Sequence, residues 1–315
     1  MTGDKQPIST HWATPPPDYH VSALLEESID GLNIRGDGVY VDATFGGGGH
    51  SREILKRLTT GRLIALDQDA DALANRPDDR RLIMEQGNFR FLRNYLAHYG
   101  IRNVDGILAD LGVSSHHFDT VERGFTFRHD APLDMRMNTG MSITAAEVIN
   151  RYPENSLREI FGQYGEVSNA QRLAGRIVTA RRSHPIERSG QLLETIKPCM
   201  PRGSENKYAA KVFQALRIAV NRELDHLKSL LLQSLDLLPA KGRLAIITYH
   251  SLEDRLVKNF LKNGLFEGEA EKDIYGQSKT PFRQINTKII TPSEHEIKAN
   301  SRVRSAKLRI GERVK

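Results

Sequence analysis

The feature that most constrains the fold is a run of four glycines, Gly46 to Gly49, between an apolar segment and a helical pattern. Residues 38–42 are typical of a buried strand, and residues 50–58 of the helix that follows it. Glycines at such a turn let the backbone approach a ligand closely, because a Cβ atom there would collide with it. A glycine cluster can also be just a tight turn, so the run alone identifies no ligand.

The same alternation of strands and helices continues through the first third of the chain. Further strand-like runs cover residues 63–66, 82–84 and 106–109. Helical patterns near residues 70–74 and 91–98 separate the later runs. Short apolar strands that alternate with helices predict an α/β fold with a doubly wound, Rossmann-like parallel sheet.

The alternation stops at about residue 121, and no clear strand pattern follows before residue 237. Seven apolar side chains in this part are spaced by three or four and predict one face of a single helix. They are Phe213, Leu216, Val220, Leu224, Leu227, Leu231 and Leu235. Strand character returns at residues 243–247, a helix is expected from Ser251, and two late strands are expected at 287–291 and 306–310.

These patterns predict one α/β domain interrupted by an all-helical insert. We expect residues 20–120 and 221–315 to form the α/β domain and residues 121–220 the insert, which could cover a substrate. The proline-rich residues 1–19 are expected to form a mobile arm.

Charge and cysteine content narrow the classes of protein. Lys and Arg total 45 against 39 Asp and Glu, with a net charge of +6 and a pI near 9.3. This surplus favours a polyanionic partner, although solubility alone explains it equally well. Cys199 is the only cysteine, which excludes an internal disulfide and fits a reducing compartment. With no apolar run of membrane-spanning length and no signal core, we expect a cytoplasmic protein without membrane contact.

Acidic residues at strand ends indicate what the glycine turn could bind. Asp67 ends the second strand about twenty residues on, where a carboxylate can accept bonds from ribose hydroxyls, and Asp110 ends the fourth. The dinucleotide pattern G-x-G-x-x-G lacks its third glycine here, since Ser51 or Arg52 stands there. Asp42 also suits a cationic sulfonium and amino group better than phosphates. S-adenosylmethionine is therefore favoured over a nicotinamide dinucleotide, which stays open.

Ordered motifs then reveal a family resemblance that runs from about His20 to Arg313. The motifs are 44–51 (Thr-Phe-Gly-Gly-Gly-Gly-His-Ser), 110–115 (Asp-Leu-Gly-Val-Ser-Ser), 123–125 (Arg-Gly-Phe), 132–137 (Pro-Leu-Asp-Met-Arg-Met), 164–166 (Tyr-Gly-Glu), 213–224, 250–255 (His-Ser-Leu-Glu-Asp-Arg) and 304–309. The chain resembles the RsmH (formerly MraW) family. These bacterial methyltransferases modify N4 of a decoding-centre cytosine, cytosine 1402, in 16S rRNA of the 30S subunit. The resemblance makes the α/β part a methyltransferase domain and the insert a substrate-recognition domain.

The resemblance also implies which residues contact S-adenosylmethionine. They are Gly48, Gly49, His50, Asp67, Phe89, Asp110 and His117. Phe89 follows the third strand, where an apolar ring can flank adenine or simply fill the core. His117 stands where the family usually has Gln.

The catalytic group is harder to place. Many amino-methyltransferases use a (D/N/S)-P-P-(Y/F) loop after the fourth strand, but here Asp110 begins Asp-Leu-Gly-Val-Ser without the prolines or the aromatic residue. Asp110 is our first candidate to orient the amine, and a purely cofactor-binding role is equally open. His250 and Tyr249 are second candidates, although Ser251 and Asp254 predict a capping box that gives this turn a structural purpose. No set of metal ligands is visible, and we expect no metal.

Candidate RNA contacts are arginines expected around the cleft. They are Arg136, Arg176, Arg217, Arg302 and Arg304. A methyltransferase with another acceptor and a non-catalytic ribosome-assembly factor remain alternatives. The sequence leaves open the oligomeric state, a homodimer included, whether free rRNA or the assembled subunit is the substrate, and whether a prior modification is needed.

Overall fold

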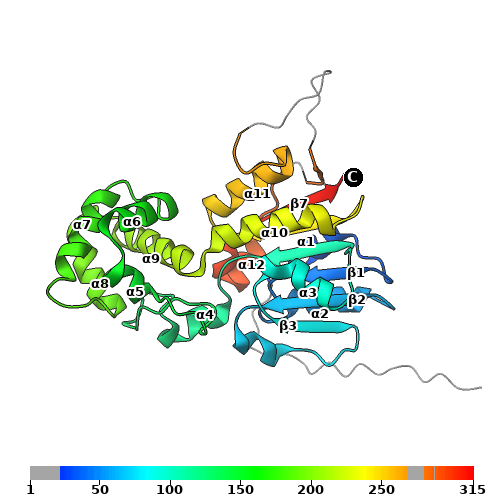
Figure 1. The fold of residues 1–315 in the computed structure, drawn as a ribbon, viewed down its shortest axis with the longest axis horizontal. Coiled ribbons are helices and arrows are strands. Elements are labelled where there is room, and N and C mark those ends of the chain that lie inside the picture. Colours follow the sequence, from blue (N-terminus) through cyan, green and yellow to red (C-terminus); the bar gives the residue numbers. More distant parts are fainter. Residues whose placement is uncertain (1–21, 269–279, 287) are drawn as a thin grey trace, which may run out of the picture.

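The computed structural model describes residues 22–268, 280–286 and 288–315. The arm expected at residues 1–19 lies outside these residues. Two parts are visible in Figure 1, a sheet covered by helices and a group of helices that extends from it. Across the described residues, none of the helices combines the length and apolar character needed to cross a lipid bilayer.

Seven strands form one sheet in the order β3-β2-β1-β4-β5-β7-β6. They are β1 (Val39–Asp42), β2 (Arg62–Asp67), β3 (Leu82–Gln86), β4 (Gly106–Asp110), β5 (Arg243–Thr248), β6 (Phe282–Gln284) and β7 (Lys307–Arg313). The first five in chain order are parallel, whereas β7 runs antiparallel to β5 and β6. The chain reverses its direction of travel between β1 and β4, which confirms the doubly wound, Rossmann-like sheet.

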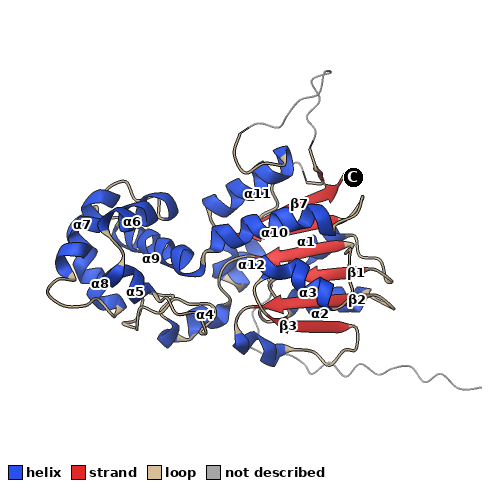
Figure 2. Cartoon of the chain, in the orientation of Figure 1, coloured by secondary structure: helices blue, strands red, loops and turns tan. Residues whose placement is uncertain are grey.

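Helices bury both faces of the sheet. On one face α1 (Leu25–Leu32) and α2 (Gly49–Arg57) pack with the short helices η1 (Ala70–Asn75) and η6 (Ser301–Ser305). The other face carries η2 (Phe89–Phe91), α3 (Leu92–His98), α10 (Glu223–Leu237) and α11 (Ser251–Asn263). The remaining helix of this part is α12 (Glu294–Ala299). Figure 2 shows these layers as blue helices against red strands. Because both faces are covered, strands such as β2 and β4 are apolar almost throughout.

The second part is helical and has its own core. Its elements are α4 (Ser115–Asp119), η3 (Val121–Arg123), α5 (Ala145–Arg151), α6 (Glu154–Glu159), the π-helix η4 (Ile160–Tyr164), α7 (Ala170–Ala180), α8 (Ser189–Ile196), η5 (Lys197–Cys199) and α9 (Glu205–Asn221). Phe161, Leu173, Leu192 and Leu216 are fully buried in this core. Between residues 121 and 237, all of which are described, the only strand-like pairing is a single bridge between Pro132 and Arg188.

The expectation of one continuous helix through residues 213–235 is wrong. Arg222 adopts a left-handed conformation (φ 51°) that ends α9 and begins α10. The buried residues of α9 belong to the helical core, and those of α10 pack on the sheet. Apolar spacing continues across the break because both helices bury a face, so periodicity does not reveal a one-residue kink.

The strand expected at residues 287–291 is also wrong for the residues described. Thr287 lies outside them, and Ile290 makes one isolated bridge to Leu308. On the side away from β5, the strand paired with β7 is β6, which has three residues and one buried side chain, Phe282. So short a strand carries no periodic signal. The last expected strand, 306–310, is confirmed within one residue at its start by β7.

Asn221 fastens the last turn of α9 to the loop before α5. Its Oδ1 accepts from the Met137 N–H (2.8 Å), and its Nδ2 donates to the Met135 carbonyl (2.7 Å). The side chain is buried, so water cannot replace these bonds readily.

We expect Asn221→Ala to destabilise the protein by about 1–3 kcal/mol for each backbone group left without a partner. Chemical denaturation followed by circular dichroism measures the free energy of unfolding. Asn94→Ala, at an exposed position of α3, is the matched control and should change it by less than about 0.5 kcal/mol. Equal effects of the two variants would contradict the assigned role of Asn221.

Candidate active site

A cavity of about 820 Å³ opens at the edge where the parallel strands end. The ends of β1, β2, β4 and β5 contribute Thr44, Asp67, Asp110 and Tyr249 to its lining, and the opposite wall comes from the junction of α9 and α10. Ligands of doubly wound sheets bind at this edge, where the strand order reverses. The volume is that of a site for a cofactor or a small substrate.

The glycine turn is required mainly by close packing within the chain. Gly46 (φ 52°) and Gly48 (φ 77°) have left-handed backbones. A Cβ on Gly48 would lie 2.6 Å from the Phe45 ring, and one on Gly49 would lie 2.1 Å from Ser22 Oγ. The glycines therefore let β1 turn sharply into α2, and the resulting loop lines the cavity.

Three carboxylates end parallel strands: Asp42 is buried, whereas Asp67 and Asp110 are partly buried and line the cavity. Asp42 accepts hydrogen bonds from Ser51 Oγ (2.6 Å) and the Thr44 N–H (3.2 Å), and burial raises its pKa to about 6. Asp67 accepts from the Gly46 N–H (2.7 Å), and burial raises its pKa also.

Asp110 is the third carboxylate of this set. Its Oδ1 accepts from the Tyr249 hydroxyl (2.9 Å), and its backbone N–H donates to Thr44 Oγ1 (2.6 Å). Burial raises the pKa of Asp110 to about 7, although the hydrogen bond from Tyr249 lowers it. Burial raises the pKa of Tyr249 well above its ordinary value, so the hydroxyl stays a donor at neutral pH.

The two carboxylates that line the cavity, Asp67 and Asp110, fit a cationic ligand, whereas Asp42 does not line it. Within the described ranges, no Lys or Arg forms an ion pair with Asp42, Asp67 or Asp110. Burial is the largest cause of each raised pKa, and the hydrogen bonds that the carboxylates accept offset it only in part. S-adenosylmethionine carries a positive sulfonium and an ammonium group, and these would supply the missing charge.

Two other predicted cofactor contacts lie at the same cavity. Phe89 is half-buried in η2 and lines the cavity, where its ring can flank a base. The His50 ring is buried, and its Nε2 lies 3.2 Å from the Ala23 carbonyl oxygen. Burial lowers the pKa of His50 to about 4, so the ring is neutral. His50 thereby holds the segment before α1 against the glycine turn.

His117 lines the cavity between Ser114 and Asp69. Its Nδ1 accepts from the Ser114 N–H (3.0 Å), and its Nε2 lies 2.8 Å from Asp69 Oδ2. Arg123 Nη1 lies 3.2 Å from the same oxygen. Burial raises the pKa of Asp69, but His117 and Arg123 outweigh it and the pKa is lowered. Nothing in the sequence signalled this cluster, because its members come from separate loops.

The capping box expected at Ser251 and Asp254 is wrong by one residue. His250 is the N-cap of α11, and Glu253 completes the box. Glu253 accepts from the Tyr249 N–H (2.9 Å), and its Oε1 lies 3.2 Å from His250 Nε2. Burial raises the pKa of Glu253, but the opposing effects of His250 and Arg217 are larger, so the pKa lies below its ordinary value. The His250 ring is thus occupied with Glu253.

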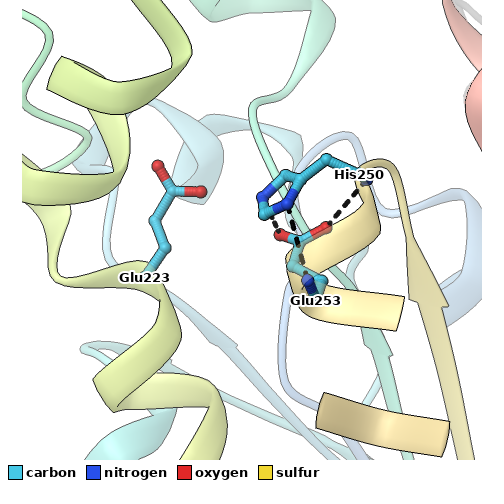
Figure 3. A group of neighbouring side chains, drawn as sticks. All are labelled: Glu223, His250 and Glu253. Carbon is cyan, nitrogen blue, oxygen red and sulfur yellow. Dashed lines mark hydrogen bonds and ion pairs between the residues drawn. The ribbon is translucent and has the colours of Figure 1, made fainter. Parts of the chain in front are cut away.

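Glu223 faces this pair from the start of α10, as Figure 3 shows. One ligand atom each from Glu223, His250 and Glu253 lies within 4.8 Å of the other two. That spacing would admit a metal ion, a set that we did not expect from the sequence. However, Arg217 already bonds both oxygens of Glu223, at 2.9 and 3.0 Å. A cation there would be repelled by the guanidinium, so we assign the cluster no metal.

The candidate RNA-contacting arginines differ in their surroundings. Arg136 is tied to Asp134 and to backbone carbonyl groups, and Arg302 pairs with Asp119 at the rim of the cavity. Arg217 is nearly buried inside the cavity wall. Arg176 and Arg304 are exposed.

The affinity for S-adenosylmethionine should fall as the pH falls from about 8 to 6. A cation binds the ionised form of Asp110, and a proton competes with it below a pKa of about 7. One linked proton changes the affinity by at most about tenfold per pH unit. Isothermal titration calorimetry measures this slope, and Asp110→Asn should flatten it. S-adenosylhomocysteine, which lacks the sulfonium charge, is the control ligand and should show a shallower slope. Equal slopes for both ligands would contradict the charge argument.

Known proteins resemble this chain over nearly its whole length. A family model described as the MraW methylase family matches residues 18–314. The chain is 53% identical over 298 residues to the ribosomal RNA small subunit methyltransferase H of Christiangramia forsetii, covering 94% of this chain and 98% of that protein. It is 56% identical over 296 residues to the protein of the same name from Bacteroides fragilis strain YCH46, covering 94% and 97%.

Among solved structures, an rRNA methylase from Streptococcus thermophilus aligns with 94% of this chain and all of its own, at 12% identity and a TM-score of 0.41. So loose a likeness adds nothing to the assignment. The family assignment rests instead on the model match over residues 18–314 and on relatives that are more than half identical over nearly their whole length. This chain belongs to the MraW methylase family.

Proposed function

We propose that this protein transfers a methyl group from S-adenosylmethionine to N4 of a decoding-centre cytosine, cytosine 1402, in 16S rRNA of the small ribosomal subunit. The observation that carries the proposal is the family match over nearly the whole chain, with relatives named ribosomal RNA small subunit methyltransferase H. The cavity carboxylates Asp67 and Asp110 support it, because they suit a cationic cofactor. The reaction would take place in the cytoplasm, where small subunits are found in bacteria.

The cofactor would lie along the glycine turn. Gly46 and Gly47 line the cavity, whereas the expected contacts Gly48 and Gly49 shape the turn behind them by packing against Phe45 and Ser22. Asp67 can accept from ribose hydroxyls, and Phe89 can flank the adenine. When bound, S-adenosylmethionine supplies an electrophilic methyl group on a positively charged sulfur. His50 and His117 support this wall through their bonds to Ala23 and Asp69.

Asp110 is the group best placed to act on the amine. The N4 lone pair is delocalised into the cytosine ring, so an acceptor for its N–H makes the nitrogen a better nucleophile. N4 forms a bond to the methyl carbon, the electron pair of the broken carbon–sulfur bond stays on sulfur, and N4 gives up one proton. A carboxylate whose pKa is about 7 can take that proton at neutral pH.

His250 has a positioning role in this proposal. Its ring caps α11 and holds Glu253, and Glu253 in turn fixes the backbone of Tyr249. Tyr249 then donates its hydroxyl to Asp110 (2.9 Å). The motif at residues 250–255 thus acts on the cavity through Asp110.

RNA would approach over the helical part and the rim. We propose residues 20–120 and 221–315 as the methyltransferase domain and residues 121–220 as the substrate-recognition domain, which has its own core. Arg176 and Arg304 are exposed and available to phosphates, and Arg302 lies at the rim. Arg136 bonds Asp134 and a backbone carbonyl of its own loop, so we assign it a role in stabilising that loop.

The direct test incubates the protein with labelled S-adenosylmethionine and undermethylated 30S subunits. The label is then mapped by nuclease digestion and mass spectrometry. Label on N4 of one decoding-centre cytosine is the expected result. Label on another base, or cofactor binding without transfer, would overturn the proposal, and the second result would favour a non-catalytic assembly factor.

Asp110→Asn should reduce turnover at least about a hundredfold, because general-base groups contribute about 10²–10⁴ in rate. Its effect on cofactor affinity should be smaller, because Asp67 and Phe89 line the same cavity and remain available to the cofactor. Single-turnover assays and calorimetry separate the two effects. Equal losses of turnover and affinity would leave Asp110 a cofactor-binding residue only.

Binding to 30S subunits should weaken steeply with salt. Arg176→Ala and Arg304→Ala should each reduce the slope of log K against log salt by roughly 0.7–0.9, the value for one phosphate contact. Arg102→Ala is the control, because Arg102 is exposed just before β4, at the opposite edge of the sheet. Filter-binding titrations at several salt concentrations measure the slope. A slope unchanged by both variants would remove these arginines from the RNA interface.

A further inference from the structure

A nearly buried ion pair lines the cavity opposite the cofactor-binding strands. Arg217, on the last turns of α9, bonds Glu223, the first residue of α10, through Nε to Oε1 (2.9 Å) and Nη2 to Oε2 (3.0 Å). Their side chains are 15% and 9% exposed, and both line the same cavity as Asp110 and Tyr249. The proposed cofactor contacts do not account for this pair.

The chain holds the pair in place from both sides. Asn221 donates to the Arg217 carbonyl and is itself bonded to Met135 and Met137, which fixes the last turn of α9. The left-handed Arg222 then turns the chain, so that Glu223 lies back against Arg217. Several buried polar bonds at one junction indicate a fixed geometry rather than a loose surface contact.

The pair offers both a donor and an acceptor to the cavity. A guanidinium has five N–H donors, and only two of them are used on Glu223. Each carboxylate oxygen can accept more than one hydrogen bond. A negative phosphate would be repelled by Glu223, so the Arg217 phosphate contact expected from sequence does not suit this place.

This pattern is complementary to one pyrimidine. Cytosine presents the N4 amine as a donor next to the acceptors N3 and O2, whereas uracil presents the acceptor O4 next to the donor N3–H. Acidic side chains are suited to accept from the cytosine amine. Uracil in the same orientation would place O4 against the carboxylate and N3–H against the guanidinium, and both contacts are repulsive.

We propose that Arg217 and Glu223 read the Watson–Crick edge of the acceptor cytosine, with Glu223 accepting from the N4 amine and Arg217 donating to N3 and O2. This inference rests on the proposed function, because it assumes that the base enters this cavity out of its stack. It makes the two residues specificity-determining groups that hold N4 toward Asp110 and the cofactor. Glu253, held by Tyr249 and His250, lines the same cavity as a second negative charge.

The test compares binding to 30S subunits with the target cytosine and to subunits with uracil at that position. S-adenosylhomocysteine is present, so that no methyl group is transferred. A specific base contact discriminates by about 1–3 kcal/mol, which is roughly 5- to 150-fold in affinity. The wild-type protein should show a preference in this range, and Glu223→Gln should reduce it to less than about twofold. Phosphate contacts are common to both subunits and cancel in the ratio.

Asp225→Asn is the matched control. It removes a carboxylate from the same turn of α10, but Asp225 is exposed and pairs with Arg222 at the surface. This variant should keep the wild-type preference. Cofactor affinity and thermal unfolding of each variant show whether it is folded.

Glu223→Gln leaves the Arg217 charge buried without its partner, which could prevent folding. The double variant Arg217→Gln/Glu223→Gln removes both charges together and should lose the preference in the same way. A folded variant that keeps the preference would overturn the proposal. So would a wild-type protein that binds both subunits equally, whatever the variants do. If wild-type protein methylates no rRNA cytosine at all, the proposed function fails instead.

Discussion

The convergence of Asp42, Asp67 and Asp110 at one edge of the sheet, the first buried and the other two partly buried, is the constraint on which the rest of the site depends. Each follows or ends a parallel strand, and parallel strands end at a common edge, so the carboxylates must gather there. No Lys or Arg of the described residues pairs with them, and burial raises the pKa of all three. The folded protein therefore carries a free-energy cost at neutral pH that a cationic ligand relieves. The glycine turn, Tyr249 and Glu253 are arranged around this charge.

The helical part completes the cavity from the other side. It has its own apolar core, but the residues that reach the cavity lie where it joins the sheet, at the end of α9 and the start of α10. Asn221 ties this junction to the loop at Met135–Met137, so the wall is held by buried polar bonds. Cofactor and acceptor base would thus be bound by different parts of one cavity. The sheet holds the first part in place, and the buried bonds of Asn221 hold the second.

Residues whose position follows from strand order could be predicted from the sequence. Asp67 and Asp110 are examples, because any parallel sheet with those strands brings them to one edge. The kink at Arg222 could not be predicted, since apolar spacing is continuous across it. The Asp69–His117–Arg123 cluster and the Arg217–Glu223 pair depend on loops and helix ends that local patterns do not place. The capping box at His250 was missed because Ser251 is the commoner N-cap residue type.

The left-handed Arg222 has a mechanical consequence. Arg222 alone connects the two helices, because α9 ends immediately before it and α10 begins immediately after it. Arg217 belongs to the helix on one side of this residue and Glu223 to the helix on the other. A rotation of the helical part about Arg222 would therefore open or close their contact directly. A large substrate that contacts both parts would therefore bear on this ion pair as well as on the other contacts between them, such as Arg123–Asp69 and Arg255–Glu166.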